Sequence, residues 1–141
     1  MRHRKYTFKI NRSSEHREAL LANMVCSLFK AGRISTTVTR AKAARRLAEK
    51  MITLGKDALA AGKTADALTA RRRAIAELGQ KDVVRTLFKD IAPRYAQRAG
   101  GYTRIIRIGQ RIGDAAEMCF LELLQETPVA APEAKKEEVK A

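Results

Sequence analysis

Apolar residues recur at helical spacing in the first part of the chain. Between residues 13 and 31, leucine, methionine, valine and phenylalanine return every three or four positions, which is the spacing of one helix face. Ser13 or Ser14 offers an N-cap, and Gly32 is placed to end the helix. The β-branched stretch from Arg33 to Thr37 follows and predicts a short strand.

A longer apolar stripe begins after Thr37 and continues at helical spacing to Ala58, and Gly62 is placed to close this second helix. Two shorter helices are predicted at about 65–78 and 81–91, with Gly79 between them. Pro93 is expected to end the last helix, because proline cannot continue one.

The pattern changes to strands in the last third of the chain. Residues 102–108 and 117–124 are strand candidates, and Gly109 together with Gly113–Asp114 marks the connection between them as a loop. The order of helix, strand, several helices and two strands predicts an α+β domain. We expect a small mixed sheet of about three strands packed against several helices.

Both ends of the chain differ from this middle. Residues 1–12 contain five lysines and arginines and no acidic residue, which predicts a basic arm. Residues 13–126 form the predicted globular domain. Residues 127–141 are poor in bulky hydrophobic residues and rich in Ala, Lys, Glu and Pro, a composition typical of a disordered tail.

The net charge of the chain indicates which classes of partner it binds. The 141 residues carry 29 Lys and Arg against 15 Asp and Glu, a formal net charge of +14. Such an excess repels itself in a compact state and usually serves a polyanionic partner. Nucleic acid is the first such partner and an anionic membrane surface the second. No stretch approaches the roughly 18 apolar residues that a spanning helix needs. We expect nucleic acid, and no membrane, as the partner.

The sharpest local signal is the segment RAGGYTRIIRIGQR, residues 98–111. No acidic residue occurs from Ala92 to Gly113, although arginines stand inside the predicted strand. Strict alternation places Arg104 and Arg107 on opposite faces. A bulge or an RNA partner on one side could each explain this pattern, and the residues leave open which arginine faces RNA.

The first half of the predicted second helix is also basic. Glu49 is its only acid between Gly32 and Asp57. A solvated helix face and a phosphate contact both remain open for this cluster. It consists of Arg40, Lys42, Arg45 and Arg46.

No motif supports catalysis or a metal site. Cys26 and Cys119 stand in apolar stretches, and neither has a C-x-x-C partner. His3 and His16 complete no zinc spacing. The phosphate-binding, dinucleotide-binding and hydrolase motifs are missing from the sequence. We therefore expect a protein that is not an enzyme and that has no cofactor, no metal and no small-molecule substrate.

Four stretches together resemble one family: MRHRK, NRSSEHREALLANMVCSL, ISTTVTRAKAARRLAEKMITLGK and PRYAQRAGGYTRIIRIGQRIGDAAEMCFLEL. They are similar to the bacterial-type large-subunit ribosomal protein numbered seventeen, from Met1 to about Leu124. Tyr6-Thr7-Phe8 departs from the smaller, more basic stretch of many relatives, which puts a phosphate contact at position 8 in doubt.

The resemblance implies a structural component of the large ribosomal subunit that binds large-subunit ribosomal RNA near the nascent-chain tunnel exit. It also implies neighbouring large-subunit proteins, a monomer within the particle and a cytoplasmic ribosome, with an organellar form left open. Charge and resemblance together give one set of candidate RNA-binding residues. These are Arg2, His3, Arg4, Lys5, Lys9, Asn11, Arg12, Arg40, Lys42, Arg45, Arg46, Arg94, Arg98, Gly100, Gly101, Tyr102, Thr103, Arg104, Arg107 and Arg111.

Two rivals stay open on the residues alone. A DNA-binding nucleoid protein fits the charge equally well and predicts binding to arbitrary duplex. A membrane-surface protein, or one with a cleaved mitochondrial presequence, fits the basic start of the chain.

Overall fold

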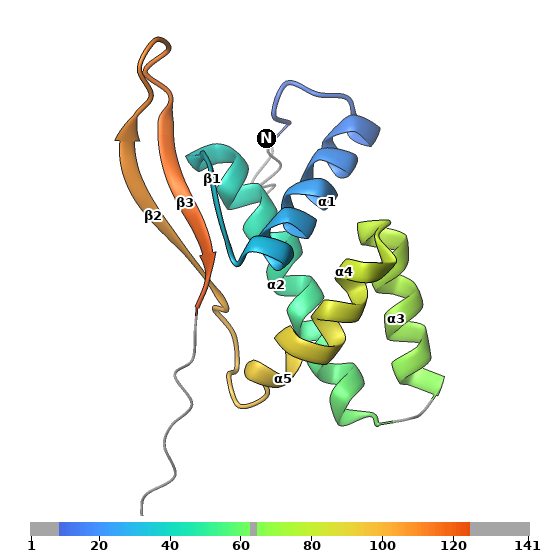
Figure 1. The fold of residues 1–141 in the computed structure, drawn as a ribbon. Helices are drawn as coiled ribbons and strands as arrows, with labels where there is room; N and C mark the ends of the chain where they lie inside the picture. Colours follow the sequence, from blue (N-terminus) through green and yellow to red (C-terminus); the bar gives the residue numbers. More distant parts are fainter. Residues whose placement is uncertain (1–8, 63–64, 125–141) are drawn as a thin grey trace, which may run out of the picture.

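The computed structural model describes residues 9–62 and 65–124, and Figure 1 shows their arrangement. The elements in chain order are α1 (Ser14–Ala31), β1 (Arg33–Thr37), α2 (Val38–Ala60), α3 (Ala65–Leu78), α4 (Lys81–Thr86), the π-helical turn η1 (Leu87–Ile91), α5 (Ala92–Arg94), β2 (Thr103–Gln110) and β3 (Glu117–Leu123). The predicted order of helices and strands is confirmed.

The three strands form one sheet in the order β1-β3-β2. This confirms the α+β class, but the expectation of a mixed sheet is wrong, because both strand pairs are antiparallel. β1 and β2 run in the same direction with β3 between them, so the described strands contain no parallel pair. The hairpin that joins β2 to β3 sets this arrangement.

The helices cover one face of the sheet, as Figure 1 shows for α1 and α2. Cys119 and Leu121 of β3 point toward them and are completely buried. The facing stripe of α2 is rich in alanine, which lets the helix lie close to the strands. Gly55 marks another close approach, since a Cβ there would stand 3.0 Å from the Cβ of Ala92.

Two helix ends follow the glycine signals. Gly32 adopts a left-handed φ of 73° and donates its N–H to the carbonyl oxygen of Leu28. Gly79 does the same at φ 70° with Ile75. The expected stop at Pro93 is wrong, because the helical path continues to Arg94. Proline is tolerated there because the first turn of a helix needs no N–H donor.

The β2–β3 hairpin is longer than the pattern predicts. Strand pairing continues through Gly109 to Gln110, and a bulge between Arg107 and Gly109 shifts the register. The bulge lies after both strand arginines, so it does not bring them to one face. Figure 1 shows the far end of the hairpin extending beyond the helices.

Some predictions concern other parts of the chain. The arm residues Arg2, His3, Arg4 and Lys5, and the tail 127–141, lie outside the described residues. Within residues 9–62 and 65–124, every helix is too short or too polar to cross a bilayer.

Candidate nucleic-acid interface

The start of α2 presents a group of cations to solvent. Arg40, Lys42, Arg45 and Arg46 are all exposed, because the alanine stripe occupies the buried side of the helix. The first turn of α2 contains no acidic residue. Cations close to a helix N-terminus are unfavourable by about 0.3–1 kcal/mol each. A bound polyanion would relieve this repulsion.

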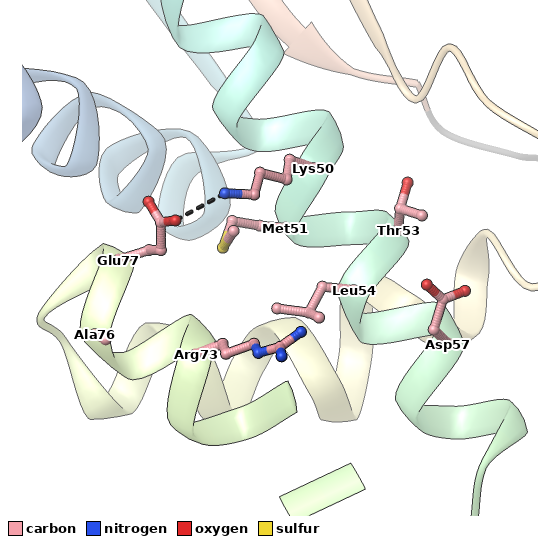
Figure 2. Close-up of a pocket in the computed structure, with 8 residues that line it drawn as sticks. All are labelled: Lys50, Met51, Thr53, Leu54, Asp57, Arg73, Ala76 and Glu77. Atoms are coloured by element: carbon pink, nitrogen blue, oxygen red, sulfur yellow. Dashed lines mark hydrogen bonds and ion pairs between the residues drawn. The ribbon is translucent and has the colours of Figure 1, made fainter. Parts of the chain in front are cut away.

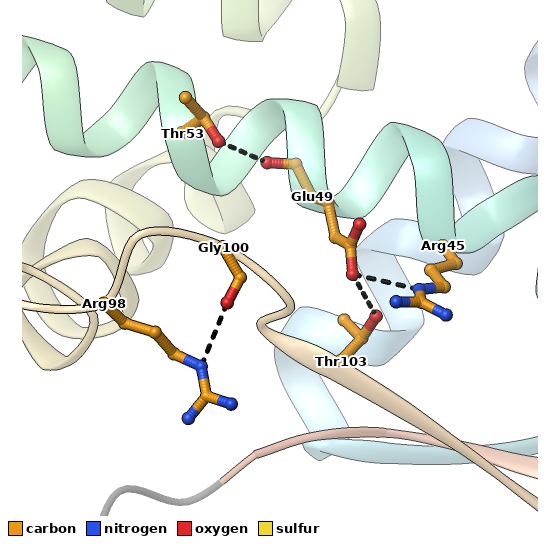
Figure 3. Close-up of polar contacts among 6 residues, drawn as sticks. All are labelled: Arg45, Glu49, Thr53, Arg98, Gly100 and Thr103. Carbon is orange, nitrogen blue, oxygen red and sulfur yellow. Dashed lines mark hydrogen bonds and ion pairs between the residues drawn. The ribbon is translucent and has the colours of Figure 1, made fainter.

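Glu49 connects α2 to the beginning of β2 (Figure 3). Its carboxylate accepts hydrogen bonds from Nε of Arg45 and from Oγ1 of Thr103, each at 3.0 Å. Thr103 is only 4% exposed. The single acid in this part of α2 therefore fixes the strand and neutralises one arginine, while Arg40 and Lys42 have no ion-pair partner among the described residues.

Tyr102 lies inside the protein, although the sequence places it among the RNA-facing residues. Its side chain is 1% exposed, and its ring lies 5.2 Å from that of Tyr95. Nζ of Lys56 donates to the Tyr102 hydroxyl at 3.1 Å and to the carbonyl oxygen of Arg98. Tyr102 and Thr103 thus position the segment, and their side chains are not available for stacking on a base.

The two glycines form the turn into β2. Gly101 has a left-handed φ of 64°, a conformation that costs other residues roughly 1–2 kcal/mol. The Gly100 carbonyl oxygen accepts a hydrogen bond from Nε of Arg98 at 3.1 Å, as Figure 3 shows. Both glycines are exposed, and so is Arg94 on α5. The turn therefore holds basic side chains next to the buried side chain of Tyr102.

Arg104 and Arg107 do lie on opposite faces, as alternation predicts. Arg107 pairs with Cys119, so it belongs to the face that the helices cover. Burial raises the pKa of the Cys119 thiol, and the positive charge of Arg107 lowers it by a smaller amount. Arg104 pairs with Glu122 on the open face. Both arginines are exposed and neither has an ion pair within the described residues.

One arginine of the segment 98–111 has a counter-ion that the acid-free sequence did not indicate. Arg111 donates to Asp114 through Nε at 3.0 Å and through a terminal nitrogen at 2.5 Å. These hydrogen bonds lower the pKa of Asp114 to about 2 and raise that of Arg111. Because Asp114 comes just after the acid-free stretch, Arg111 already has a partner in its own turn.

The described part of the basic arm forms a turn before α1. The backbone N–H of Arg12 donates to the carbonyl oxygen of Lys9 at 3.2 Å, and Asn11 has a positive φ of 50°. Lys9, Asn11 and Arg12 are all exposed. Their side chains are open to an external anion.

Sequence reasoning missed two groups. Lys56 carries the contacts that fix the turn before β2, but a lysine near the end of a helix gave no signal of this role. Arg33 lies 3.9 Å above the ring of Phe120. That contact depends on the pairing of β1 with β3, which the sequence does not specify.

The surface of the described residues has several shallow hollows. One of about 640 Å³ lies between α2 and α3, and Figure 2 shows Lys50 reaching Glu77 across it at 2.8 Å. Its remaining charged groups, Asp57 and Arg73, come with apolar neighbours. Within residues 9–62 and 65–124, no three His, Cys, Asp or Glu side chains gather as a metal site would require.

Comparison with known proteins identifies relatives along nearly the whole chain. The model of the family described as "Ribosomal protein L17" matches residues 20–124. The "Large ribosomal subunit protein bL17" of Finegoldia magna is 55% identical over 133 residues, which cover 94% of this chain and 95% of the relative. Those of Carboxydothermus hydrogenoformans and Fusobacterium nucleatum are 51% and 50% identical, over 84% and 88% of this chain and 99% and 100% of theirs. The chain belongs to the ribosomal protein L17 family, as its sequence motifs indicated.

Proposed function

We propose that this protein is a structural constituent of the large ribosomal subunit in the bacterial cytoplasm. It binds large-subunit ribosomal RNA through phosphate and shape contacts. Its relatives carry the name of a large-subunit protein, and the family is structural rather than enzymatic. Its expected neighbours are other large-subunit proteins, and its expected place is near the exit of the nascent-chain tunnel.

One observation supports the RNA contact most strongly. Cations on the first half of α2 point to solvent and have no acid in the first helical turn. Arg104 and Arg107 on β2 accompany them, without an ion pair in the part of the chain that the structure describes. Arginine presents planar pairs of donors that match phosphate oxygens. We assign the contact to the exposed side chains of the predicted set. The described members are Lys9, Asn11, Arg12, Arg40, Lys42, Arg45, Arg46, Arg94, Arg104 and Arg107. Arg98 is half-buried and donates to the Gly100 carbonyl oxygen, so it supports the turn beside them.

The other predicted residues take different parts in this proposal. Tyr102, Thr103, Gly100 and Gly101 shape the turn that presents the arginines. Arg111 stabilises the hairpin end through Asp114. The arm residues Arg2, His3, Arg4 and Lys5 keep their proposed RNA contacts on the basis of the family motif alone.

Sedimentation tests the assembly directly. A lysate fractionated on a sucrose gradient at moderate salt should place the protein with the large subunit. Raising the salt should release it, because each neutralised phosphate contributes about −0.7 to −0.9 to the log–log slope of affinity against salt. Finding the protein free of ribosomal particles, or together with the nucleoid, would support the DNA-binding rival and contradict this function.

A further inference from the structure

The open face of the sheet carries an aromatic and arginine platform at its centre. Phe120 lies in the middle strand, between Ser35 of β1 and Ile106 of β2 in the register. The guanidinium of Arg33 lies 3.9 Å from the centroid of the Phe120 ring. The helices pack on the other face, where Cys119 and Leu121 are buried, so no described element covers this platform.

The charge of the platform is positive. Arg33, Glu122 and Arg104 form one row across the three strands. Glu122 accepts the ion pair from Arg33 at 3.3 Å, and Arg104 has no ion pair among the described residues. One carboxylate between two arginines leaves a net cation beside the apolar centre, which is complementary to a polyanion.

The chemistry of these groups favours unpaired nucleotides over a regular duplex as the bound polyanion. The Arg33 side chain is 51% exposed above the ring, and its planar guanidinium can stack on a base on its outer side. Ile106, 37% exposed, adds apolar surface next to it. A regular duplex keeps its bases inside the helix and offers mainly phosphates and sugars. Unpaired nucleotides offer base planes together with phosphates, which this surface matches.

We propose that the open face of the sheet binds unpaired nucleotides of RNA, with a base stacked on Arg33 over Phe120 and a phosphate on Arg104. This inference rests on the proposed RNA-binding function and adds a second surface to it. The cations of α2 contact the backbone of folded RNA, whereas the open face of β1, β2 and β3 takes single-stranded bases.

A tryptophan reporter tests the stacking. The chain contains no Trp, so Phe120→Trp in the full-length protein places a single fluorophore in the platform. We expect a ten-nucleotide oligoadenylate to quench its emission, while a duplex RNA and inorganic polyphosphate at equal phosphate concentration do not. Equal quenching by all three probes, or none by the oligoadenylate, would overturn the inference.

Conservative variants separate stacking from charge. Arg33→Lys keeps the positive charge but removes the planar guanidinium. Phe120→Leu keeps an apolar side chain but removes the aromatic ring. Each should lower the affinity for oligoadenylate about tenfold, with affinity for a folded large-subunit RNA fragment within about twofold of wild type. Arg72→Lys, at an exposed position of α3, is the matched control and should change neither affinity. Circular dichroism would verify that every variant is folded.

The outcomes distinguish this inference from the proposed function. If the wild-type protein binds the folded RNA fragment but the platform variants bind oligoadenylate normally, only the inference fails. If the wild-type protein binds no RNA, both fail. A photo-crosslinking residue at Ser35, exposed on β1, should capture RNA in the assembled particle. Capture of protein instead of RNA would assign the platform to a protein neighbour and contradict the proposal.

Discussion

Basic residues are abundant in two regions of the molecule, but their surroundings differ. From Val38 to Lys50, the first half of α2 carries five cations and one acid. From Ala65 to Ile91, the segment that contains α3, α4 and η1 carries six cations and four acids. Figure 1 shows that α3 lies against the second half of α2, whereas the first half lies beside the sheet.

The difference shows that the arrangement of the charges matters more than their number. Cations mixed with acids repel each other less and need no external anion. The guanidinium of Arg71 even lies over the ring of Phe88, at 5.4 Å. The one acid in the first half of α2 is already engaged by Arg45 and Thr103. The excess positive potential is therefore concentrated near the sheet.

Removing charge from α2 should have the largest effect. We expect Arg40→Ala combined with Lys42→Ala to weaken binding to a large-subunit RNA fragment roughly tenfold and to reduce the salt slope by about 1.4–1.8. The paired control, Arg72→Ala with Arg85→Ala, should change affinity less than about twofold. Fluorescence anisotropy across a salt series would measure both pairs. Similar losses in the two pairs would show that the charges act only in bulk.

Single strand arginines should have a smaller effect. Arg104→Ala and Arg107→Ala each remove one cation that has no ion pair among residues 9–62 and 65–124. Each should therefore weaken RNA binding by a few-fold and reduce the salt slope by about 0.7–0.9. Lys140→Ala in the tail should leave both quantities unchanged in the same assay. An effect of Lys140→Ala equal to that of the strand variants would contradict a localised interface.

The buried tyrosine should affect stability and leave RNA binding intact. Tyr102→Phe removes the hydroxyl that accepts from Lys56, and we expect the free energy of unfolding to fall by about 1 kcal/mol. Urea denaturation measures this change, and anisotropy on the folded variant should show unchanged RNA affinity. A strong loss of affinity with normal stability would mean that the tyrosine contacts RNA after all.

The hairpin end should give the smallest effect, seen only in acid. Because the folded pKa of Asp114 is lowered to about 2, its pair with Arg111 stabilises the turn above the unfolded pKa. That contribution is lost as pH falls through the folded value. NMR titration of the Asp114 carboxyl should give a midpoint near 2, whereas a midpoint near its ordinary value of 3.8 would show that the pair does not form in solution.

Local signals predicted most of the fold. Apolar spacing placed the helices, and Gly32 and Gly79 marked two of their ends, because these features depend on nearby residues. The antiparallel sheet and the contact of Arg33 with Phe120 depend on residues far apart in the chain, so no local pattern specified them. Pro93 misled because its place in a first helical turn depends on the preceding π-helical turn.

The candidate site was predicted unevenly for a similar reason. The basic cluster of α2 could be predicted from the sequence. Alanines fill the buried side of this helix, so its cations lie on the solvent side. The alternation rule correctly separated Arg104 from Arg107. It could not show that Tyr102 is buried, because that depends on Tyr95 and Lys56 from other elements.

Ultraviolet crosslinking of intact large subunits, followed by mass spectrometry of the crosslinked peptides, tests the central claim most directly. We predict RNA-linked peptides from the first half of α2 and from residues 98–107, and none from residues 65–91. RNA-linked peptides concentrated in residues 65–91, with α2 and β2 free of RNA, would contradict the account.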